Sequence, residues 1–191
     1  SFDLKARKGR LVKAPFVPGE NSMRALFAWL CVLDGGLLVH SCGVVKDGEG
    51  YLFFGHSGAG KSTVAGLSRQ FTILSDDMVM VKKANGVFHA CGVPFRGEFL
   101  DSPLTNEQAP LKGVFRLVKD AGHYLEPASR PAMVASLLAS VPFMSDQIDL
   151  GERAAATCAH LLAAVPYGRL HFRRDEGFWG VIGNTSIAGI H

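Results

Sequence analysis

This 191-residue chain has little excess of one charge over the other, no cysteine motif and no long apolar run. The formal net charge is only +3, so the concentrated basic face of a nucleic-acid-binding protein is not expected. No uncharged apolar run approaches the roughly 20 residues that span a bilayer, and the first residues lack the apolar segment of a signal peptide. The four cysteines form no CxxC pair and no dense disulfide framework. We therefore expect a cytoplasmic protein that partners neither membrane nor nucleic acid.

What the chain does contain is the composition of one globular domain. Apolar residues make up 48% and charged residues 19% of it, and single domains of about 50 to 250 residues are usual. We expect a single domain over residues 1–191. Residues 1–20 form an N-terminal arm, and residues 94–113, rich in proline, glycine and polar side chains, form a surface loop or lid.

Periodicity and turn residues divide the rest of the chain into helices and strands. The Asp-Gly pair at 47–48 and the Asn-Gly pair at 85–86 each predict a β-hairpin. We expect helices at residues 21–33, 61–70, 129–141 and 149–165, and strands at 37–45, 51–54, 71–75, 78–84, 87–93, 114–119, 168–174 and 178–183.

The segment GHSGAGKST matches the phosphate-binding pattern GxxxxGK[ST]. A predicted strand precedes it and a helix-compatible run follows, which is the context that such a loop requires. Glycines allow successive backbone N–H groups to point at phosphate oxygens, Lys61 can reach the β- and γ-phosphates, and the Ser62 hydroxyl suits Mg²⁺. The alternative is a glycine turn with a chance lysine. The expected nucleotide-binding residues are Gly55, Ser57, Gly58, Ala59, Gly60, Lys61, Ser62 and Thr63.

Two adjacent acids, Asp76 and Asp77, end the next apolar run. If that strand lies parallel to residues 51–54 in one sheet, its C-terminal end is beside the glycine loop. One carboxylate can then bind Mg²⁺ while the other accepts a proton from an attacking hydroxyl. The alternative is a turn or a surface pair, because Asp is common in turns.

The runs LVHSCGVV, GHSGAGKST and LSDD, in this order and spacing, resemble the catalytic domain of HPr kinase/phosphorylase and its smaller relatives over residues 37–82. The resemblance implies an α/β domain of the phosphoenolpyruvate carboxykinase type, with helices packed on a mixed sheet. It also implies ATP- and Mg²⁺-dependent transfer of phosphate to a serine hydroxyl. Carried over by position, His40, Asp76 and Lys61 are the catalytic residues, Asp76 being the base, while Asp77 joins Ser62 at the metal. Homo-oligomers are common in that family.

The sequence departs from that family after residue 82. We find no clear second glycine-rich loop, so neither dephosphorylation nor HPr as the substrate is implied. The leading hypothesis is a kinase that acts on a serine-type hydroxyl of a protein or peptide. A small-metabolite kinase and a non-catalytic nucleotide sensor are the alternatives. Arg96, Arg173 and Arg174 are candidates for a further cation at the transferring phosphoryl group.

Overall fold

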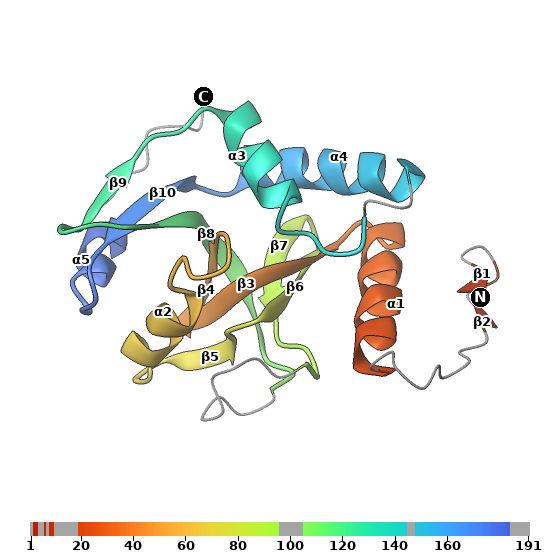
Figure 1. The fold of residues 1–191 in the computed structure, drawn as a ribbon, viewed down its shortest axis with the longest axis horizontal. Coiled ribbons are helices and arrows are strands. Elements are labelled where there is room, and N and C mark those ends of the chain that lie inside the picture. The colour runs from red at the N-terminus through yellow and green to blue at the C-terminus, as the bar shows by residue number, and fades with distance from the viewer. Residues whose placement is uncertain are drawn as a thin grey trace.

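A computed structural model describes residues 2, 3, 6, 8, 9, 19–95, 105–144 and 148–183 (Figure 1). Helices and strands alternate around one large sheet. The helices are α1 (Gly19–Leu33), α2 (Lys61–Leu67), α3 (Arg130–Leu138), α4 (Ile148–Ala164) and α5 (Phe178–Gly183). The strands are β1 (Phe2–Asp3), β2 (Lys8–Gly9), β3 (Leu37–Lys46), β4 (Glu49–Phe54), β5 (Thr72–Ser75), β6 (Met78–Ala84), β7 (Val87–Cys91), β8 (Gln108–Lys119), β9 (Tyr124–Glu126) and β10 (Tyr167–Phe172).

Two long strands, β3 and β8, organise the eight-stranded sheet because each changes neighbours along its length. The first residues of β3 pair with β6, and its later residues pair with β4 and β5, all antiparallel. The start of β8 is antiparallel to β7, whereas its remainder is parallel to β4 and β10. The sheet is thus mixed and mostly antiparallel, which confirms the expected α/β class at this level.

The strands β4 and β5 lie on opposite sides of β3. Both are antiparallel to β3, so they run parallel to each other, and their C-terminal ends reach the same edge of the sheet. Residues 55–60 follow β4, and Asp76 and Asp77 follow β5. The predicted placement of the acid pair beside the glycine loop is therefore confirmed.

Both hairpin turns form where the sequence predicts them. Asp47 and Gly48 have φ values of 54° and 78°, and Asn85 and Gly86 have φ values of 50° and 83°. Left-handed backbone at both central residues is what a two-residue type I′ turn needs, and Asp-Gly and Asn-Gly tolerate it best. These turns join β3 to β4 and β6 to β7.

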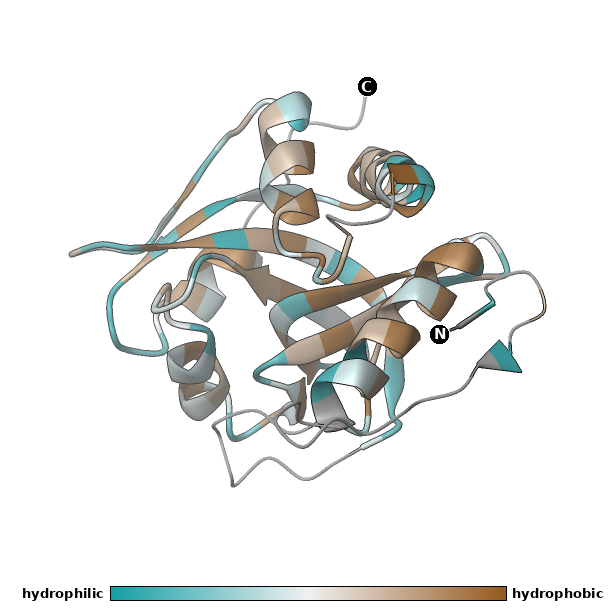
Figure 2. Cartoon of the chain, turned by 45° about the vertical axis from the view of Figure 1, so that its right-hand side comes forward, coloured by the Kyte–Doolittle hydropathy of each residue, from teal (hydrophilic) through white to brown (hydrophobic). Residues whose placement is uncertain are grey.

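The helices cover the two faces of the sheet unequally. Helices α1, α3 and α4 pack on one face together with Leu52 and Phe54, and α2 and α5 pack on the other with Tyr51 and Phe53. The alternation along β4 is the strand period of two, with both faces buried. Figure 2 shows the hydrophobic residues concentrated along the inner strands and the helix surfaces that meet them. No helix in the described parts of the chain is long and apolar enough to cross a bilayer.

All four cysteines are free and buried. Burial raises the thiol pKa of Cys31 and of Cys158 to about 12. It also raises the pKa of Cys42, which is fully buried on β3, and that of Cys91. These side chains act as small apolar groups of the core.

The strand predicted at 178–183 is wrong, because this segment is the helix α5. The backbone N–H of Gly177 donates to the Asp175 carboxylate (2.9 Å), and a turn then leads into the helix. Phe178, Trp179 and Ile182 are buried at helical spacing, and the Trp179 indole N–H donates to the Ser68 hydroxyl (3.2 Å). Aromatic and β-branched composition favours strands, but here the two aromatic rings of α5 pack against Tyr51, Phe53 and Phe71 under the sheet, and this tertiary packing decides otherwise.

The predicted loop at 94–113 is shorter at its C-terminal end, because β8 begins at Gln108 and not at Val114. Residues 108–113 alternate between exposed and buried, which is the pattern of a half-covered strand. Residues 96–104 of that loop, Arg96 included, lie outside the described residues. So does most of the predicted arm over residues 1–20; within it β1 and β2 pair with each other, and α1 begins at Gly19.

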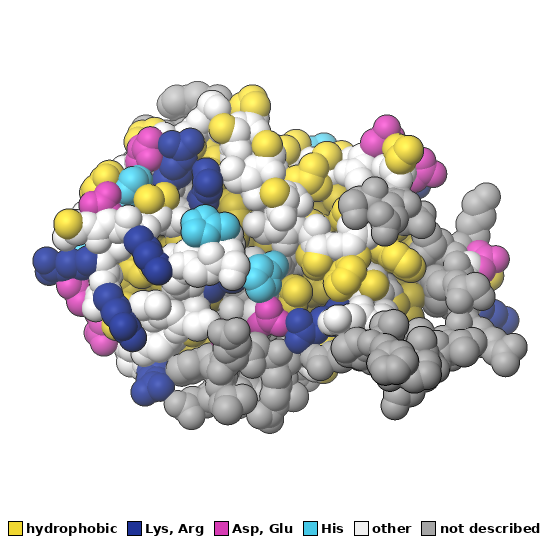
Figure 3. All heavy atoms as spheres, viewed as in Figure 1, with side chains coloured by type: hydrophobic (Ala, Val, Ile, Leu, Met, Phe, Trp, Pro, Cys, Tyr) yellow, Lys and Arg dark blue, Asp and Glu magenta, His cyan; other side chains and the backbone are white. Residues whose placement is uncertain are grey.

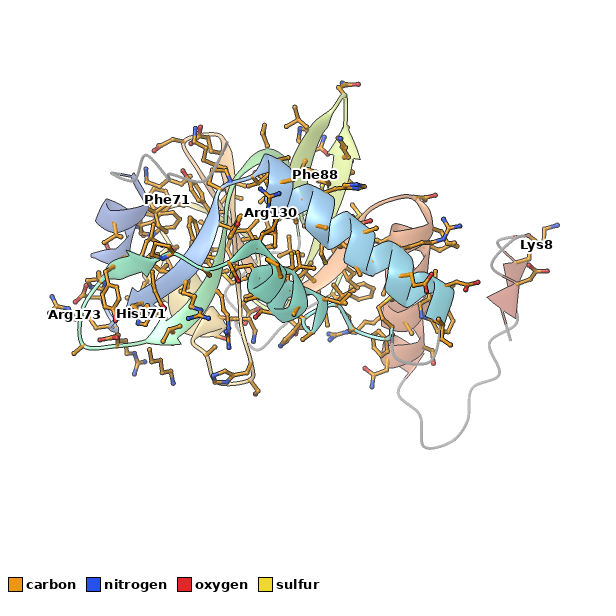
Figure 4. The ribbon with its side chains drawn as sticks, turned by 90° about the horizontal axis from the view of Figure 1, so that it is seen from above. Lys8, Phe71, Phe88, Arg130, His171 and Arg173 are labelled. Atoms are coloured by element: carbon orange, nitrogen blue, oxygen red, sulfur yellow. The ribbon has the colours of Figure 1, made fainter. Side chains whose placement is uncertain are left out.

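The short strand β9 was not predicted, and charged side chains fix it against β10. The His171 ring lies between two carboxylates, with Nδ1 2.9 Å from Asp120 Oδ2 and Nε2 3.0 Å from Glu126 Oε2. The ring of Tyr124 stacks on it with centroids 4.2 Å apart. Figure 4 shows His171 and Arg173 at the end of the sheet far from α1.

Candidate functional site

The glycine loop is a tight turn in which Gly58 and Gly60 adopt a backbone conformation that suits glycine. Gly58 and Gly60 have φ values of 78° and 109°, in the left-handed region that other residues avoid. A Cβ on Gly60 would lie 2.7 Å from Cζ of Phe172, whereas a Cβ on Gly58 meets nothing within 4 Å. Gly60 therefore holds the loop against the sheet and leads into α2, whose first free N–H groups face the loop.

This contrast predicts different costs for two alanine substitutions. Gly60→Ala combines backbone strain with a clash against a buried aromatic ring, so we expect the free energy of unfolding to fall by about 2–4 kcal/mol. Gly58→Ala carries the backbone strain alone, about 1–2 kcal/mol. Urea unfolding of both variants measures the difference. Equal losses would show that the contact with Phe172 does not restrain the loop.

Lys61 lies within the loop that precedes it. Its side chain is buried, and Nζ donates to the backbone carbonyls of Gly55 (3.1 Å) and His56 (3.3 Å). The ammonium group is therefore held by the carbonyl oxygens at the start of the loop. Such a cation attracts an anion because it is held in place and shielded from bulk water.

The first acid of the pair, Asp76, belongs to the loop side of the sheet. It is only 4% exposed, and its Oδ2 accepts a hydrogen bond from the Ser62 hydroxyl (3.1 Å). The sequence led us to expect Ser62 beside Asp77. The structure places it beside Asp76 instead, because Ser62 lies in the first turn of α2, where its hydroxyl reaches the Asp76 carboxylate.

The second acid, Asp77, contacts residues on the α1 side of the sheet. Its Oδ2 accepts from Arg24 Nη1 of α1 (2.8 Å), and its Oδ1 accepts from His40 Nδ1 of β3 (3.0 Å). Burial alone raises the pKa of Asp77, but the hydrogen bond from His40 and the charge of Arg24 outweigh it, so the pKa lies below its usual value. Asp77 is therefore ionised at neutral pH.

The two acids are separated by the geometry of the chain between β5 and β6. Both strands pair with β3, and the interruption falls at Asp76 and Asp77. The Ser75 hydroxyl accepts from the N–H groups of Asp77 and Met78 (3.1 Å each), and Ser41 N–H donates to the Asp77 carbonyl (3.0 Å). Successive side chains of extended backbone point to opposite faces, so adjacent acids meet different partners.

One cavity of about 630 Å³ joins these groups. Histidine, acidic and basic side chains gather at the centre of the face drawn in Figure 3, below α3. The residues that line this cavity, hereafter the loop cavity, are Arg24, His40, Ser57, Gly58, Gly60, Lys61, Ser62, Thr63, Asp76, Asp77 and Lys119. All three predicted catalytic residues and both predicted metal ligands are among them. Gly55 and Ala59 are not: Gly55 lines a neighbouring cavity, and Ala59 is buried in the core on the α2 side of the sheet.

Two cations of this cavity were missed by sequence reasoning. Arg24 lies on α1, far from the motif in sequence, and Lys119 ends β8. Neither position carries a local pattern that marks it as functional. Of the arginines predicted from the sequence, Arg173 pairs with Asp175, and neither Arg173 nor Arg174 lines the cavity.

The donor set around Ser62 fits a magnesium ion that is shared with a nucleotide. Mg²⁺ prefers oxygen ligands, keeps several waters and is commonly held by one or two carboxylates together with substrate phosphates. The Asp76 carboxylate and the Ser62 hydroxyl are in mutual contact at the mouth of the loop. Among the described residues no group of three His, Cys, Asp or Glu side chains forms a closed metal cage. The Asp76 carboxylate and the Ser62 hydroxyl could therefore supply two oxygen ligands to such an ion.

Comparisons with known proteins give one family. No curated protein matches the chain. Among solved structures, the HPr(Ser) kinase/phosphatase from Coxiella burnetii is similar at 20% identity and a TM-score of 0.35, over 47% of this chain and 69% of that chain. A family model described as SynChlorMet cassette protein ScmC matches residues 22–183, which is most of the chain. The chain described here therefore belongs to the ScmC family.

Proposed function

We propose that this protein is an ATP- and Mg²⁺-dependent kinase that transfers the γ-phosphoryl group to a serine-type hydroxyl of a protein or peptide. The observation that carries the proposal is the contact of Ser62 with Asp76 at the mouth of a glycine loop in which Lys61 is buried. Loop N–H groups, a lysine, a hydroxyl and a carboxylate are the set that binds nucleotide phosphates with their metal. The helix α2 adds the positive end of its dipole.

The proposal assigns the acids differently from the sequence-based expectation. Asp76 and Ser62 would hold Mg²⁺, which would offset negative charge on the nucleotide phosphates. Asp77 is a poor proton acceptor, because both of its oxygens already accept hydrogen bonds and its pKa is lowered. Its role is to fix His40 beside the γ-phosphate and to balance the charge of that ring.

His40 then receives the proton of the acceptor hydroxyl. Its Nδ1 donates to Asp77, which leaves Nε2 of the neutral ring as the acceptor atom, and its side chain is 39% exposed at the cavity. The hydroxyl oxygen bonds to the γ-phosphorus, the bond from that phosphorus to the β–γ bridging oxygen breaks, and ADP leaves with its electron pair. The proton passes to His40 Nε2. Arg24 and Lys119 offset charge on the equatorial oxygens.

The direct test is labelled phosphate transfer with the intact chain. The protein is incubated with γ-labelled ATP, Mg²⁺ and a degenerate library of serine-containing peptides, and the products are identified by mass spectrometry. We expect phosphoserine peptides and stoichiometric ADP. His40→Gln should lower kcat about a hundredfold or more and leave the Kd for ATP within about twofold.

Two other results would point to the alternative functions. Label that appears only in a panel of hydroxylated metabolites would indicate a small-molecule kinase. Tight ATP binding with no transfer to any hydroxyl would indicate a nucleotide sensor. Failure to bind ATP at all would contradict every form of the proposal.

A further inference from the structure

A second cavity adjoins the loop cavity on the side of α3. Its volume is about 690 Å³, and it shares His40 and Ser57 with the loop cavity. We call it the α3 cavity; its lining residues are His40, Phe54, Gly55, His56, Ser57, Met78, Arg116, Ala135, Ser136, Ala139, Ser140 and Pro142. His40 therefore stands between Lys61, Ser62 and Asp76 on one side and, on the other, a second space that none of these three residues lines.

The charge of the α3 cavity is of one sign. Arg116 and two histidines line it, and no acidic side chain among the described residues does. Arg116 lies on β8 between Phe115 and Leu117, which are buried on the α2 side, so its own side chain is on the α3 side. It forms no ion pair with any of the described residues. Its cross-strand neighbour Arg169, by contrast, donates to Glu126 (2.9 Å).

The remaining wall of this cavity is small and weakly polar. Ala135 and Ala139 lie one helical turn apart at the C-terminal end of α3, and both are exposed. Phe54 and Met78 supply apolar surface from the sheet. The Ser140 carbonyl accepts from His40 N–H (2.7 Å), which ties this wall to the proposed base. The space thus suits an apolar chain segment that carries one negative group near its reacting hydroxyl.

We propose that the α3 cavity is the acceptor site and that it selects a peptide in which a carboxylate side chain lies close to the phosphorylated serine. The carboxylate pairs with Arg116, whose planar guanidinium binds carboxylates through two parallel hydrogen bonds. Small apolar neighbours of the serine pack on Ala135, Ala139 and Met78. The serine hydroxyl meets His40 where the two cavities join. This inference rests on the proposed kinase function.

The test compares short blocked peptides that contain one serine and one aspartate, with the aspartate moved through the flanking positions, each against its asparagine twin. Binding is measured by calorimetry with a non-hydrolysable ATP analogue and Mg²⁺, and kcat/KM is measured with ATP. For at least one register we expect the Asp peptide to be preferred about tenfold or more. Arg116→Gln should abolish the preference and Arg116→Lys should keep part of it.

Arg169→Gln is the matched control, because it removes a neighbouring arginine on the same sheet face that lines neither cavity. Thermal unfolding of each variant excludes loss of fold. A steric variant, Ala139→Phe, should block peptide binding while the ATP analogue still binds.

An Asp preference that survives Arg116→Gln would overturn the proposal, as would equal binding of Asp and Asn peptides in every register. If the ATP analogue binds but no peptide does, the acceptor site is wrong and nucleotide binding stands. If the analogue itself does not bind, the proposed function fails first.

Discussion

Replacing Lys61 with methionine is expected to lower kcat/KM for phosphoryl transfer by about a thousandfold or more. The ammonium group stabilises the negative charge that shifts toward the leaving phosphate oxygens during transfer. A single preorganised hydrogen-bond donor in an active site contributes a factor of about 10²–10³ to the rate, and a cation at the phosphoryl group can contribute more. Methionine keeps the length and the apolar stem of the side chain. The carbonyls of Gly55 and His56 lose their donor, but both residues line the α3 cavity, where water can replace it.

The fold should survive this change, because the packing of the buried stem is retained. Lys112→Met is the matched control: Lys112 lies on β8, is 58% exposed and pairs with Glu49 outside the cavity. Initial rates with γ-labelled ATP and thermal unfolding temperatures are measured for both variants. Transfer that continues at the wild-type rate in Lys61→Met would show that the loop is not the phosphate site.

Asp76→Asn and Asp77→Asn are expected to have different effects on the magnesium requirement. Asparagine keeps the shape of Asp76 and can still accept from Ser62, but it removes the charge that attracts the ion. We expect kcat/KM to fall about a hundredfold or more and the Mg²⁺ concentration for half-maximal rate to rise about tenfold or more. Asp77→Asn should also slow transfer, because it loosens His40, but with an unchanged magnesium requirement.

Titration of the initial rate with MgCl₂ at saturating ATP distinguishes the two variants. If Asp77→Asn raises the magnesium requirement and Asp76→Asn does not, Asp77 is the metal ligand, as the sequence predicts. The proposal that Asp76 binds the metal is then wrong. Circular dichroism of Asp77→Asn is needed beside the rates, because this variant also weakens the contact with Arg24 that joins α1 to the sheet.

The parts of the fold that could be predicted are those that local chemistry determines. Asp47-Gly48 and Asn85-Gly86 determine their turns, the apolar spacing determines α1 and α4, and the glycine motif lies between a strand and a helix as expected. The prediction that both acids lie near the loop also succeeded, because it required only that β4 and β5 be parallel in one sheet.

The parts that could not be predicted depend on tertiary contacts. The start of β8 was predicted as loop because it contains Pro110 and polar neighbours. The helix α5 was predicted as a strand because its composition is β-prone. Which acid meets Ser62 depends on the faces that α1 and α2 cover, and no sequence pattern states this. Arg24 reaches the site only because α1 packs beside β3.

The fully buried thiol of Cys42 offers a built-in reporter for this region. Its β3 strand separates the glycine loop from the acid pair, and a raised pKa leaves almost no reactive thiolate while the sheet is closed. Alkylation of Cys42 therefore requires the layer that includes α2 to move off the sheet, and its rate measures how often that layer opens. Any molecule that bridges the two sides of β3 must slow the labelling, whatever its chemical identity.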